Sequence, residues 1–233
     1  MKLKNFLAQE TKGFNLFEKI FFPLEIILII AISIILKDNK IALISAIAGI
    51  SYTILAGKGK ISCYIIGLCG TFCYCYLAFK NGFYGNLALY GLYFFPMQVI
   101  GLIKWKKHIE KETGSIKKTC LTTKERIFYL NAALILSLIL SYILFLTNDK
   151  NPIIDSIVTI LSIIAQILTV KRCIEQWYLW LIVNILTFIM WIIAYINGSN
   201  CFATIIMWAT YVFLAIYFLH SWKKELTSNE ENI

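Results

Sequence analysis

Charged residues and histidine are scarce in this chain. Only 15% of its 233 residues are charged, whereas 59% are hydrophobic, a far more apolar balance than that of an ordinary soluble domain. Histidine occurs only as His108 and His220, and the sequence has no His-Glu-x-x-His motif, no Gly-x-Ser-x-Gly motif and no phosphate-binding loop. The seven cysteines form no Cys-x-x-Cys pair. These absences exclude a soluble globular protein and argue against an enzyme, a metal site or a cofactor.

Long hydrophobic segments are abundant. A membrane-spanning helix needs roughly 17 to 25 apolar residues, and eight segments of the chain meet that length. The sequence therefore predicts an all-α integral membrane protein with eight transmembrane helices. The segments cover residues 20–36, 41–57, 61–79, 83–103, 127–146, 153–170, 177–196 and 202–219.

The net charge of +9 follows the predicted topology. If the eight segments alternate across the membrane, all 22 Lys and Arg residues fall on one side except Lys37, Lys40, Lys80 and Lys150. Basic loops stay in the cytoplasm, so we expect both termini to be cytoplasmic, and we attribute the charge to topology and not to nucleic-acid binding. The only acidic residues inside the segments, Glu25 and Asp155, lie near predicted helix starts, where a carboxylate can reach the headgroup region.

The chain contains an internal repeat. Each copy contains, in the same order, a basic turn, an Asn-Gly turn and a helix end with the sequence Trp-Lys-Lys. In the first copy these features lie at Lys58, Asn81 and Trp105, and in the second copy they lie at Lys171, Asn197 and Trp222. Three helices per copy with one helix between the copies predict parallel repeats, an architecture of transporters. The expected organisation is an extra N-terminal helix (1–40), a first repeat (41–107), a loop and linker helix (108–152), a second repeat (153–224) and a cytoplasmic tail (225–233).

One helix of the second repeat carries polar and aromatic residues on a single face. Trp177, Trp180, Asn184, Thr187 and Trp191 are three or four residues apart, so they share a face of an α-helix. We interpret Trp177 as a residue of the interfacial aromatic belt. Asn184 lies in mid-helix, where its amide must bond to a neighbouring helix or face a wet cavity. Trp180, Asn184 and Thr187 are candidate substrate contacts.

The last helix of the first repeat has a similar face. Asn86, Tyr90 and Gln98 lie on it as candidate contacts, and Gly101 continues it. Pro96 interrupts helical hydrogen bonding just before Gln98, so it predicts either a gating kink, shared with Gly101, or a static bend. Further candidate contacts on neighbouring helices are Thr71, Tyr74, Trp208 and Tyr211.

Two segments resemble a known family of membrane proteins. The first repeat of PnuC-type nicotinamide riboside transporters is similar to two segments of this chain and to Trp105. The segments are Leu55-Ala56-Gly57-Lys58-Gly59-Lys60 and Phe94-Phe95-Pro96-Met97-Gln98-Val99-Ile100-Gly101. The second repeat of these transporters is similar to a further segment, Arg172-Cys173-Ile174-Glu175-Gln176-Trp177-Tyr178-Leu179-Trp180-Leu181-Ile182-Val183-Asn184. The resemblance covers roughly residues 41–224. It implies a SWEET-like 3+1+3 core, a homotrimer in the bacterial inner membrane, and facilitated diffusion of a dephosphorylated vitamin that a cytosolic kinase then traps. One departure is Gly67, which stands where the repeat offset would place a counterpart of Trp180.

The candidate residues suit nicotinamide riboside. Aromatic faces attract its pyridinium cation, and amide side chains match its carboxamide and hydroxyl groups. A phosphate would require Arg or Lys at depth, but both arginines, Arg126 and Arg172, lie at helix ends. Thiamine, riboflavin or a sugar remain alternative substrates. A membrane scaffold without transport activity is the alternative from another class, and it would use Asn184 and Gln98 only to hold helices together.

Overall fold

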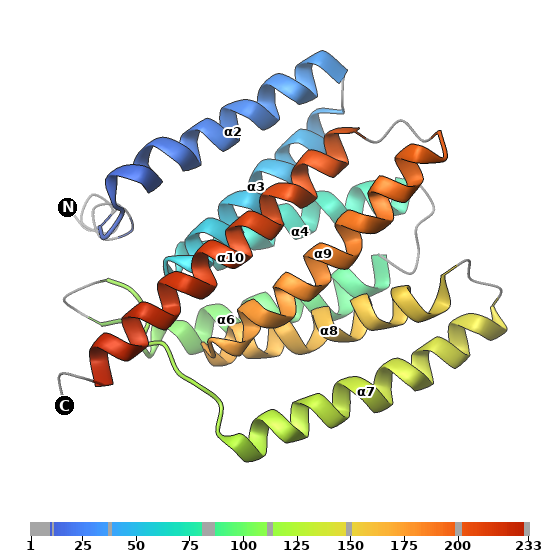
Figure 1. Ribbon diagram of the computed structural model, residues 1–233. Coiled ribbons are helices and arrows are strands. Elements are labelled where there is room, and N and C mark those ends of the chain that lie inside the picture. Colours follow the sequence, from blue (N-terminus) through green and yellow to red (C-terminus); the bar gives the residue numbers. More distant parts are fainter. Residues whose placement is uncertain are drawn as a thin grey trace. The chain divides into compact units, whose positions relative to one another are not determined.

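The structure is a computed structural model that describes residues 10, 12–36, 39–80, 87–110, 114–147, 151–198 and 202–230. Across these residues the chain forms eight helical stretches and no extended strand. Six of the described helices are long and apolar enough to cross a membrane, and the predictions of an all-α fold and of eight helices are confirmed. The stretches in Figure 1 are α2 (Leu16–Leu36), α3 (Lys40–Gly57), α4 (Ser62–Lys80), η1 (Leu89–Phe94) continuing into α6 (Phe95–Lys106), α7 (Thr123–Leu146), α8 (Pro152–Lys171), α9 (Glu175–Ile196) and α10 (Phe202–Glu230).

Two helix boundaries differ from the prediction. α2 begins at Leu16 instead of residue 20, so Glu25 lies in the middle of the helix and not near its start. α10 continues to Glu230 through residues predicted as a tail, because the segment after Trp222 contains no Gly or Pro and is rich in good helix formers. Asp155 does lie in the first turn of α8, as expected.

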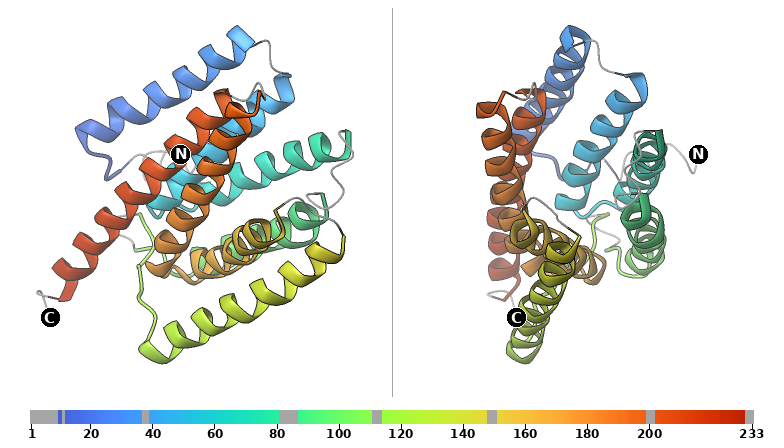
Figure 2. Two further views of the ribbon diagram at one scale, coloured as in Figure 1. Left: turned by 45° about the vertical axis from the view of Figure 1, so that its right-hand side comes forward. Right: turned by 90° about the vertical axis from the view of Figure 1, so that its right-hand side faces the viewer.

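The chain divides into two compact units, Met1–Lys117 and Lys118–Ile233. In the first unit α4 packs against α3 and against η1 and α6, and α2 packs on α3. In the second unit α9 packs against α8 and α10, and α7 packs on α8. Figure 2 shows these neighbours within each unit. Each unit thus consists of three helices with the middle one in contact with both others, and a fourth helix that contacts the first of the three.

A buried ion pair joins the first two described helices of the first unit. Asn15 and Glu18 begin α2 as a capping box, because each side chain accepts a 2.8 Å hydrogen bond from the other residue's backbone N–H. The Glu18 carboxylate also binds the Lys58 ammonium at 2.9 Å, and the Glu18 side chain is only 1% exposed. Lys58 lies 5.3 Å from the centre of the Phe14 ring. The start of α2 is therefore held at the end of α3 by charge as well as by packing.

The same backbone turn occurs in both units. Gly59 and Arg172, 113 residues apart, both have a φ of +67°, and their carbonyls accept 3.0 Å hydrogen bonds from Ile116 N–H and Thr119 N–H respectively. A left-handed conformation is unfavourable for a residue with a side chain. At Gly59 a Cβ would also lie 2.9 Å from Ile116 Cγ1. The first turn therefore requires glycine, whereas the second accommodates Arg172.

Large aromatic rings pack behind both turns. Tyr64 meets Trp105 edge to face with ring centres 4.9 Å apart, and Trp177 meets Trp222 in the same way at 5.8 Å. All four side chains are buried. The interpretation of Trp177 as an interfacial belt residue is therefore wrong, because this ring lies on the face of α9 that packs against α10 and contacts Phe218 there as well.

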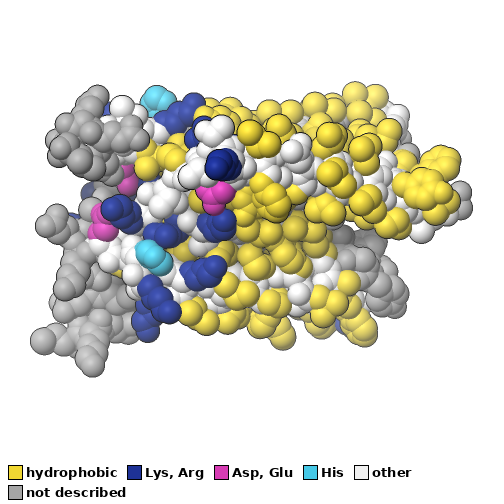
Figure 3. Space-filling model, turned by 90° about the horizontal axis from the view of Figure 1, so that it is seen from below, with side chains coloured by type: hydrophobic (Ala, Val, Ile, Leu, Met, Phe, Trp, Pro, Cys, Tyr) yellow, Lys and Arg dark blue, Asp and Glu magenta, His cyan; other side chains and the backbone are white. Residues whose placement is uncertain are grey.

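Hydrophobic side chains are exposed along the sides of the helices. α7 has no fully buried residue, and Leu130 and Phe145 are 71% and 68% exposed. On the face in Figure 3, hydrophobic side chains cover most of the length of the helices, and Lys and Arg gather towards one end. Extended apolar surfaces of this kind are unfavourable in water, so the helices are suited to a hydrocarbon environment.

Candidate functional site

A short π-helix brings three aromatic rings together in the first unit. In η1 the N–H of Phe95 donates to the carbonyl of Tyr90, five residues back, which is the hydrogen-bond pattern of a π-helix. The Tyr90 ring lies 4.2 Å from the Tyr74 ring of α4 and 5.0 Å from the Phe94 ring, centre to centre. Two predicted contact residues, Tyr74 and Tyr90, therefore meet directly, in a part of a helix whose geometry is often found at functional sites.

Pro96 lies directly after this π-helix, in the first turn of α6. Proline has no N–H to donate and its ring crowds the carbonyl four residues earlier, and the change from π- to α-helix occurs at this position. The irregular hydrogen bonding lies in the residues before Pro96, and the choice between a gating kink and a static bend at Pro96 stays a prediction. Asn86, the other candidate on this face, lies outside the described residues.

Gln98 is buried and linked to the neighbouring helix. Its side-chain N–H donates a 2.6 Å hydrogen bond to the Thr71 hydroxyl of α4. Its carbonyl oxygen Oε1 is buried without a hydrogen-bond partner among the described residues. That oxygen lies over Gly67, where a Cβ would collide with it and would also approach Tyr52 to 2.7 Å. Gly67 thus provides the space that the Gln98 amide occupies, and Gln98 and Thr71 form one polar pair.

Gly101 has a packing role in the same core. A Cβ at this position would overlap the Tyr64 ring, whose phenol oxygen would be only 2.6 Å away. Tyr64 is fully buried, and its hydroxyl has no hydrogen-bond partner within the described part of the chain. The absence of a side chain at Gly101 therefore lets α4 and α6 approach each other around this ring. Its predicted part in gating stays a prediction.

In the second unit Asn184 bridges two helices. Its amide N–H donates a 3.0 Å hydrogen bond to the backbone carbonyl of Tyr211 in α10, and the side chain is buried. The ring of Tyr211 lies 5.5 Å from the ring of Trp208. The structure thus brings together the candidates Asn184, Tyr211 and Trp208, as it brings together Gln98 and Thr71 in the first unit.

The remaining candidates of α9 point to different partners. The Trp180 indole N–H donates to the Thr169 hydroxyl of α8 at 3.3 Å. Thr187 donates to Val183 O in its own helix at 2.8 Å, an ordinary bond for a threonine inside a helix. These two residues share a helix with Asn184 but not its hydrogen-bond partners.

Some buried polar groups were not among the predicted candidates. Besides Gln98 Oε1 and the Tyr64 hydroxyl, the Gln176 amide nitrogen and the Trp177 indole nitrogen are buried and have no hydrogen-bond partner among the residues described. Alignment of the two repeats could have indicated Tyr64 and Trp177 as equivalent positions, because these two residues are 113 residues apart, as are Gly59 and Arg172. No sequence pattern indicates which of their polar atoms remains unpaired, because that depends on the neighbouring helices.

The basic side chains lie away from the helix interiors. Within the described residues no Lys or Arg occurs in 41–57, 62–79, 87–103, 127–146, 153–170, 177–198 or 202–222. Lys60 is buried, yet it follows the end of α3 and donates to the Gly114 carbonyl at 3.3 Å. The aromatic and amide groups described above are therefore not accompanied by cations from their own helix segments.

Thiol labelling can test whether the turn before α9 is buried as described in the second unit. Cys173 is 4% exposed, and burial raises the pKa of its thiol, whereas Cys120 is exposed. The thiolate is the form of cysteine that reacts with a maleimide. At neutral pH we therefore expect a variant that retains only Cys120 to be labelled much faster than a variant that retains only Cys173. We expect the labelling rate of Cys173 to rise at alkaline pH. Equal rates in the folded proteins would contradict the buried position of Cys173; denatured samples provide the control.

Comparison with known proteins relates the chain to a transporter family. The family model described as "Nicotinamide mononucleotide transporter" matches residues 39–224. The nicotinamide riboside transporter PnuC of Neisseria mucosa is 31% identical over 192 residues, which cover 80% of this chain and 73% of the relative. The PnuC protein of Haemophilus influenzae is 30% identical over 227 residues, which cover 96% of this chain and 97% of the relative.

A solved structure resembles the described fold. The structure titled "Crystal structure of the Vitamin B3 transporter PnuC" superposes with a TM-score of 0.80 at 28% sequence identity. The superposition covers 94% of this chain and 96% of the other. The similarity extends over almost the whole length of both chains.

Proposed function

Because the chain belongs to the PnuC family of transporters, we propose that it carries nicotinamide riboside across the membrane. The observation that carries this proposal is the similarity to nicotinamide riboside transporters along the length of the chain, which reaches 96% of it for the Haemophilus influenzae protein. The local chemistry supports the same substrate. The clustered rings of Tyr74, Tyr90 and Phe94 offer π faces for a pyridinium cation, and Gln98 Oε1 is an acceptor that a carboxamide or ribose hydroxyl could satisfy.

We propose the riboside and not the mononucleotide as the substrate. Phosphate recognition relies on charge-assisted hydrogen bonds. The helix segments that carry the candidate residues contain no Lys or Arg in their described interiors. A bound phosphate would therefore lose its hydration without a cation in those segments to replace it.

We propose facilitated diffusion as the mode of transport, with trapping by a cytosolic kinase. Coupled transporters use carboxylates at depth as proton or sodium relays. In the described helices, Asp155 lies in a first turn, and Glu25 belongs to α2, outside the two proposed repeats. These two carboxylates are poorly placed to relay a proton or a sodium ion through the repeats, so the substrate gradient is the remaining driving force.

We also propose that residues 41–107 and 153–224 are parallel repeats of a SWEET-like core in a homotrimer with cytoplasmic termini. The repeated turns at Gly59 and Arg172 and the repeated ring pairs Tyr64–Trp105 and Trp177–Trp222 support a duplicated unit. The distribution of Lys and Arg supports the orientation. The trimer rests on the family resemblance alone.

Calorimetric titration of the purified protein in detergent tests the substrate. We expect nicotinamide riboside to bind, and nicotinamide mononucleotide, thiamine, riboflavin and a simple sugar to give little or no heat. Equal or tighter binding of the mononucleotide would overturn the exclusion of phosphate. Heat from none of the ligands would favour the scaffold alternative, for which the Asn184 and Gln98 bonds between helices would be a sufficient explanation.

Variants of the polar pair in the first unit distinguish ligand binding from helix packing. Gln98→Leu removes both the bond to Thr71 and the unpaired Oε1, whereas Thr71→Val removes the bond but keeps Oε1. If Oε1 binds substrate, we expect Gln98→Leu to weaken nicotinamide riboside binding about tenfold, the value of one lost hydrogen bond, and Thr71→Val to weaken it much less. Equal losses of affinity and of thermal stability in both variants would assign Gln98 to packing.

A further inference from the structure

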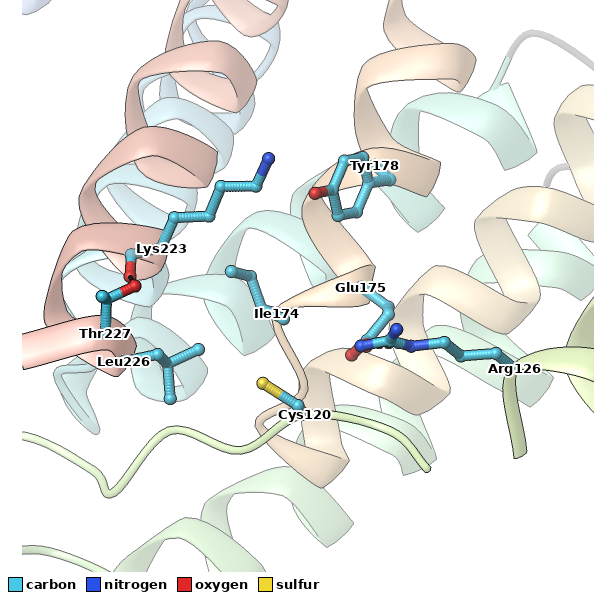
Figure 4. Close-up of a pocket in the computed structure, with 8 residues that line it drawn as sticks. All are labelled: Cys120, Arg126, Ile174, Glu175, Tyr178, Lys223, Leu226 and Thr227. Carbon is cyan, nitrogen blue, oxygen red and sulfur yellow. Dashed lines mark hydrogen bonds and ion pairs between the residues drawn. The ribbon is translucent and has the colours of Figure 1, made fainter. Parts of the chain in front are cut away.

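A cavity opens at one end of the second unit, away from the residues proposed to bind substrate. Its volume is about 450 Å³. The N-terminal ends of α7 and α9 and the last turns of α10 form its walls, together with the segment before α7. Figure 4 shows the side chains that line it, which are Cys120, Arg126, Ile174, Glu175, Tyr178, Lys223, Leu226 and Thr227.

Two cations enter this cavity from different helices. Arg126 comes from the first turn of α7 and Lys223 from α10, and Tyr178 and Glu175 of α9 lie between them (Figure 4). Lys223 is positioned by the Tyr178 ring, whose centre lies 5.1 Å from its ammonium, and within the described residues it forms no ion pair. The cavity therefore presents an ammonium that is held in place but not neutralised by a carboxylate.

Glu175 orients the second cation. Its carboxylate oxygen Oε1 lies 2.9 Å from both Arg126 Nε and Arg126 Nη2 and accepts from the backbone N–H of Leu121 at 3.1 Å. A guanidinium has five N–H donors, so this contact leaves Arg126 donors for another oxygen. Arg126, Lys223 and Glu175 together give the lining a net positive charge, whereas the Thr227 hydroxyl already donates to the Lys223 backbone carbonyl at 3.1 Å.

An exposed apolar strip runs along α9 from the cavity. Ile182, Ile185 and Ile189 follow Tyr178 at steps of four, three and four residues, which places them on one helix face. They are 45%, 39% and 46% exposed. In a membrane transporter such a strip suits contact with acyl chains, and the cavity lies at its basic end.

We propose that this cavity binds the headgroup phosphate of an anionic phospholipid, such as phosphatidylglycerol, whose acyl chains lie along the strip of Ile182, Ile185 and Ile189. The phosphate accepts hydrogen bonds from the Lys223 ammonium and from the Arg126 donors that do not bind Glu175. Basic pockets between membrane helices are known to recognise anionic headgroups in this way. A free phosphate would match the cations but leave the apolar strip unused, and a zwitterionic lipid would match the strip but bring its own cation to a positive cavity.

Native mass spectrometry of the detergent-solubilised protein tests this assignment independently of transport. The protein is titrated with phosphatidylglycerol, phosphatidylcholine of the same chain length, and inorganic phosphate. The variants are Lys223→Gln and, as the control, Lys224→Gln, which changes the neighbouring exposed residue of α10 that does not line the cavity. Both substitutions are at exposed positions, so elution of each variant as the same monodisperse particle is the folding control.

We expect wild type and Lys224→Gln to retain phosphatidylglycerol in preference to phosphatidylcholine, and Lys223→Gln to retain it about fivefold less, as expected for one interfacial basic residue. Inorganic phosphate alone should neither bind nor displace the lipid. Three results would overturn the proposal: equal retention of both lipids, equal behaviour of the two variants, or displacement of the lipid by inorganic phosphate. Because the readout is lipid and not nicotinamide riboside, failure here leaves the proposed function untouched, and the reverse also holds.

Discussion

Replacing Gly101 by Ala is expected to lower the thermal stability of the protein strongly. The new Cβ would overlap the Tyr64 ring, which is fully buried and in edge-to-face contact with the equally buried Trp105. The ring therefore has no free space to move into, and α4 and α6 must separate. Extra atoms in a well-packed core cost about 1–3 kcal/mol and occasionally more, and this overlap places Gly101→Ala at the upper end.

The matched control lies ten residues earlier in the same continuous helical stretch. At Gly91 the nearest atom to an added Cβ is the Cys75 sulfur, 4.0 Å away. Since alanine favours helical structure over glycine, Gly91→Ala should leave the unfolding temperature unchanged or raise it slightly. Thermal unfolding of both variants in detergent, followed by size-exclusion fluorescence, compares them. Similar unfolding temperatures for the two variants would mean that Tyr64 does not pack against Gly101 as described.

Neutralising Glu18 is the second substitution with a large expected effect. Glu18→Gln keeps the capping box with Asn15, because glutamine can fill the same role, but it leaves the Lys58 ammonium without its carboxylate. Lys58 has a side chain only 15% exposed. Removing one partner of a buried pair costs about 3–5 kcal/mol. For a chain of this size that loss corresponds to a fall of roughly 10 °C in unfolding temperature.

Glu125→Gln provides the matched control in the second unit. Glu125 occupies the same position of a capping box, with Thr122, and also pairs with a lysine, Lys171, at 3.5 Å. Both partners of this pair are about 40% exposed, and exposed pairs contribute little. We expect the unfolding temperature of Glu125→Gln to remain near that of wild type. A fall as large as that of Glu18→Gln would show that loss of the capping carboxylate, and not of the buried ion pair, explains both results.

The polar residues of the candidate site show how far helix periodicity can predict contacts. The spacing of Trp180, Asn184 and Thr187 correctly placed them along one helix. It could not show that Asn184 donates to the backbone of α10 while Trp180 donates to Thr169 of α8. Sequence spacing determines the face of a helix, but the partner of a buried amide is determined by which helix packs on that face.

The π-helix in the first unit was only partly predictable. Pro96 indicated a break in regular α-helix, since proline removes a hydrogen bond wherever it occurs. The neighbouring side chains determine which residues near the proline depart from α-helical hydrogen bonding. Here the residues before the proline form the π-helix, and Tyr90 thereby reaches Tyr74. The aromatic cluster that supports the proposed substrate therefore depends on packing between α4 and η1.

The sequence by itself determined the membrane class, the eight helices and their approximate bounds. Hydrocarbon requires about twenty apolar residues per crossing with every backbone group bonded inside the helix, so composition and length decide these features locally. The tertiary structure alone decided that Glu18 pairs with Lys58, that Gly67 and Gly101 make room for Gln98 and Tyr64, and that Arg126 and Lys223 share a cavity. Each of these contacts joins residues distant in the chain, and their energies depend on burial and close approach, which only the packed helices create.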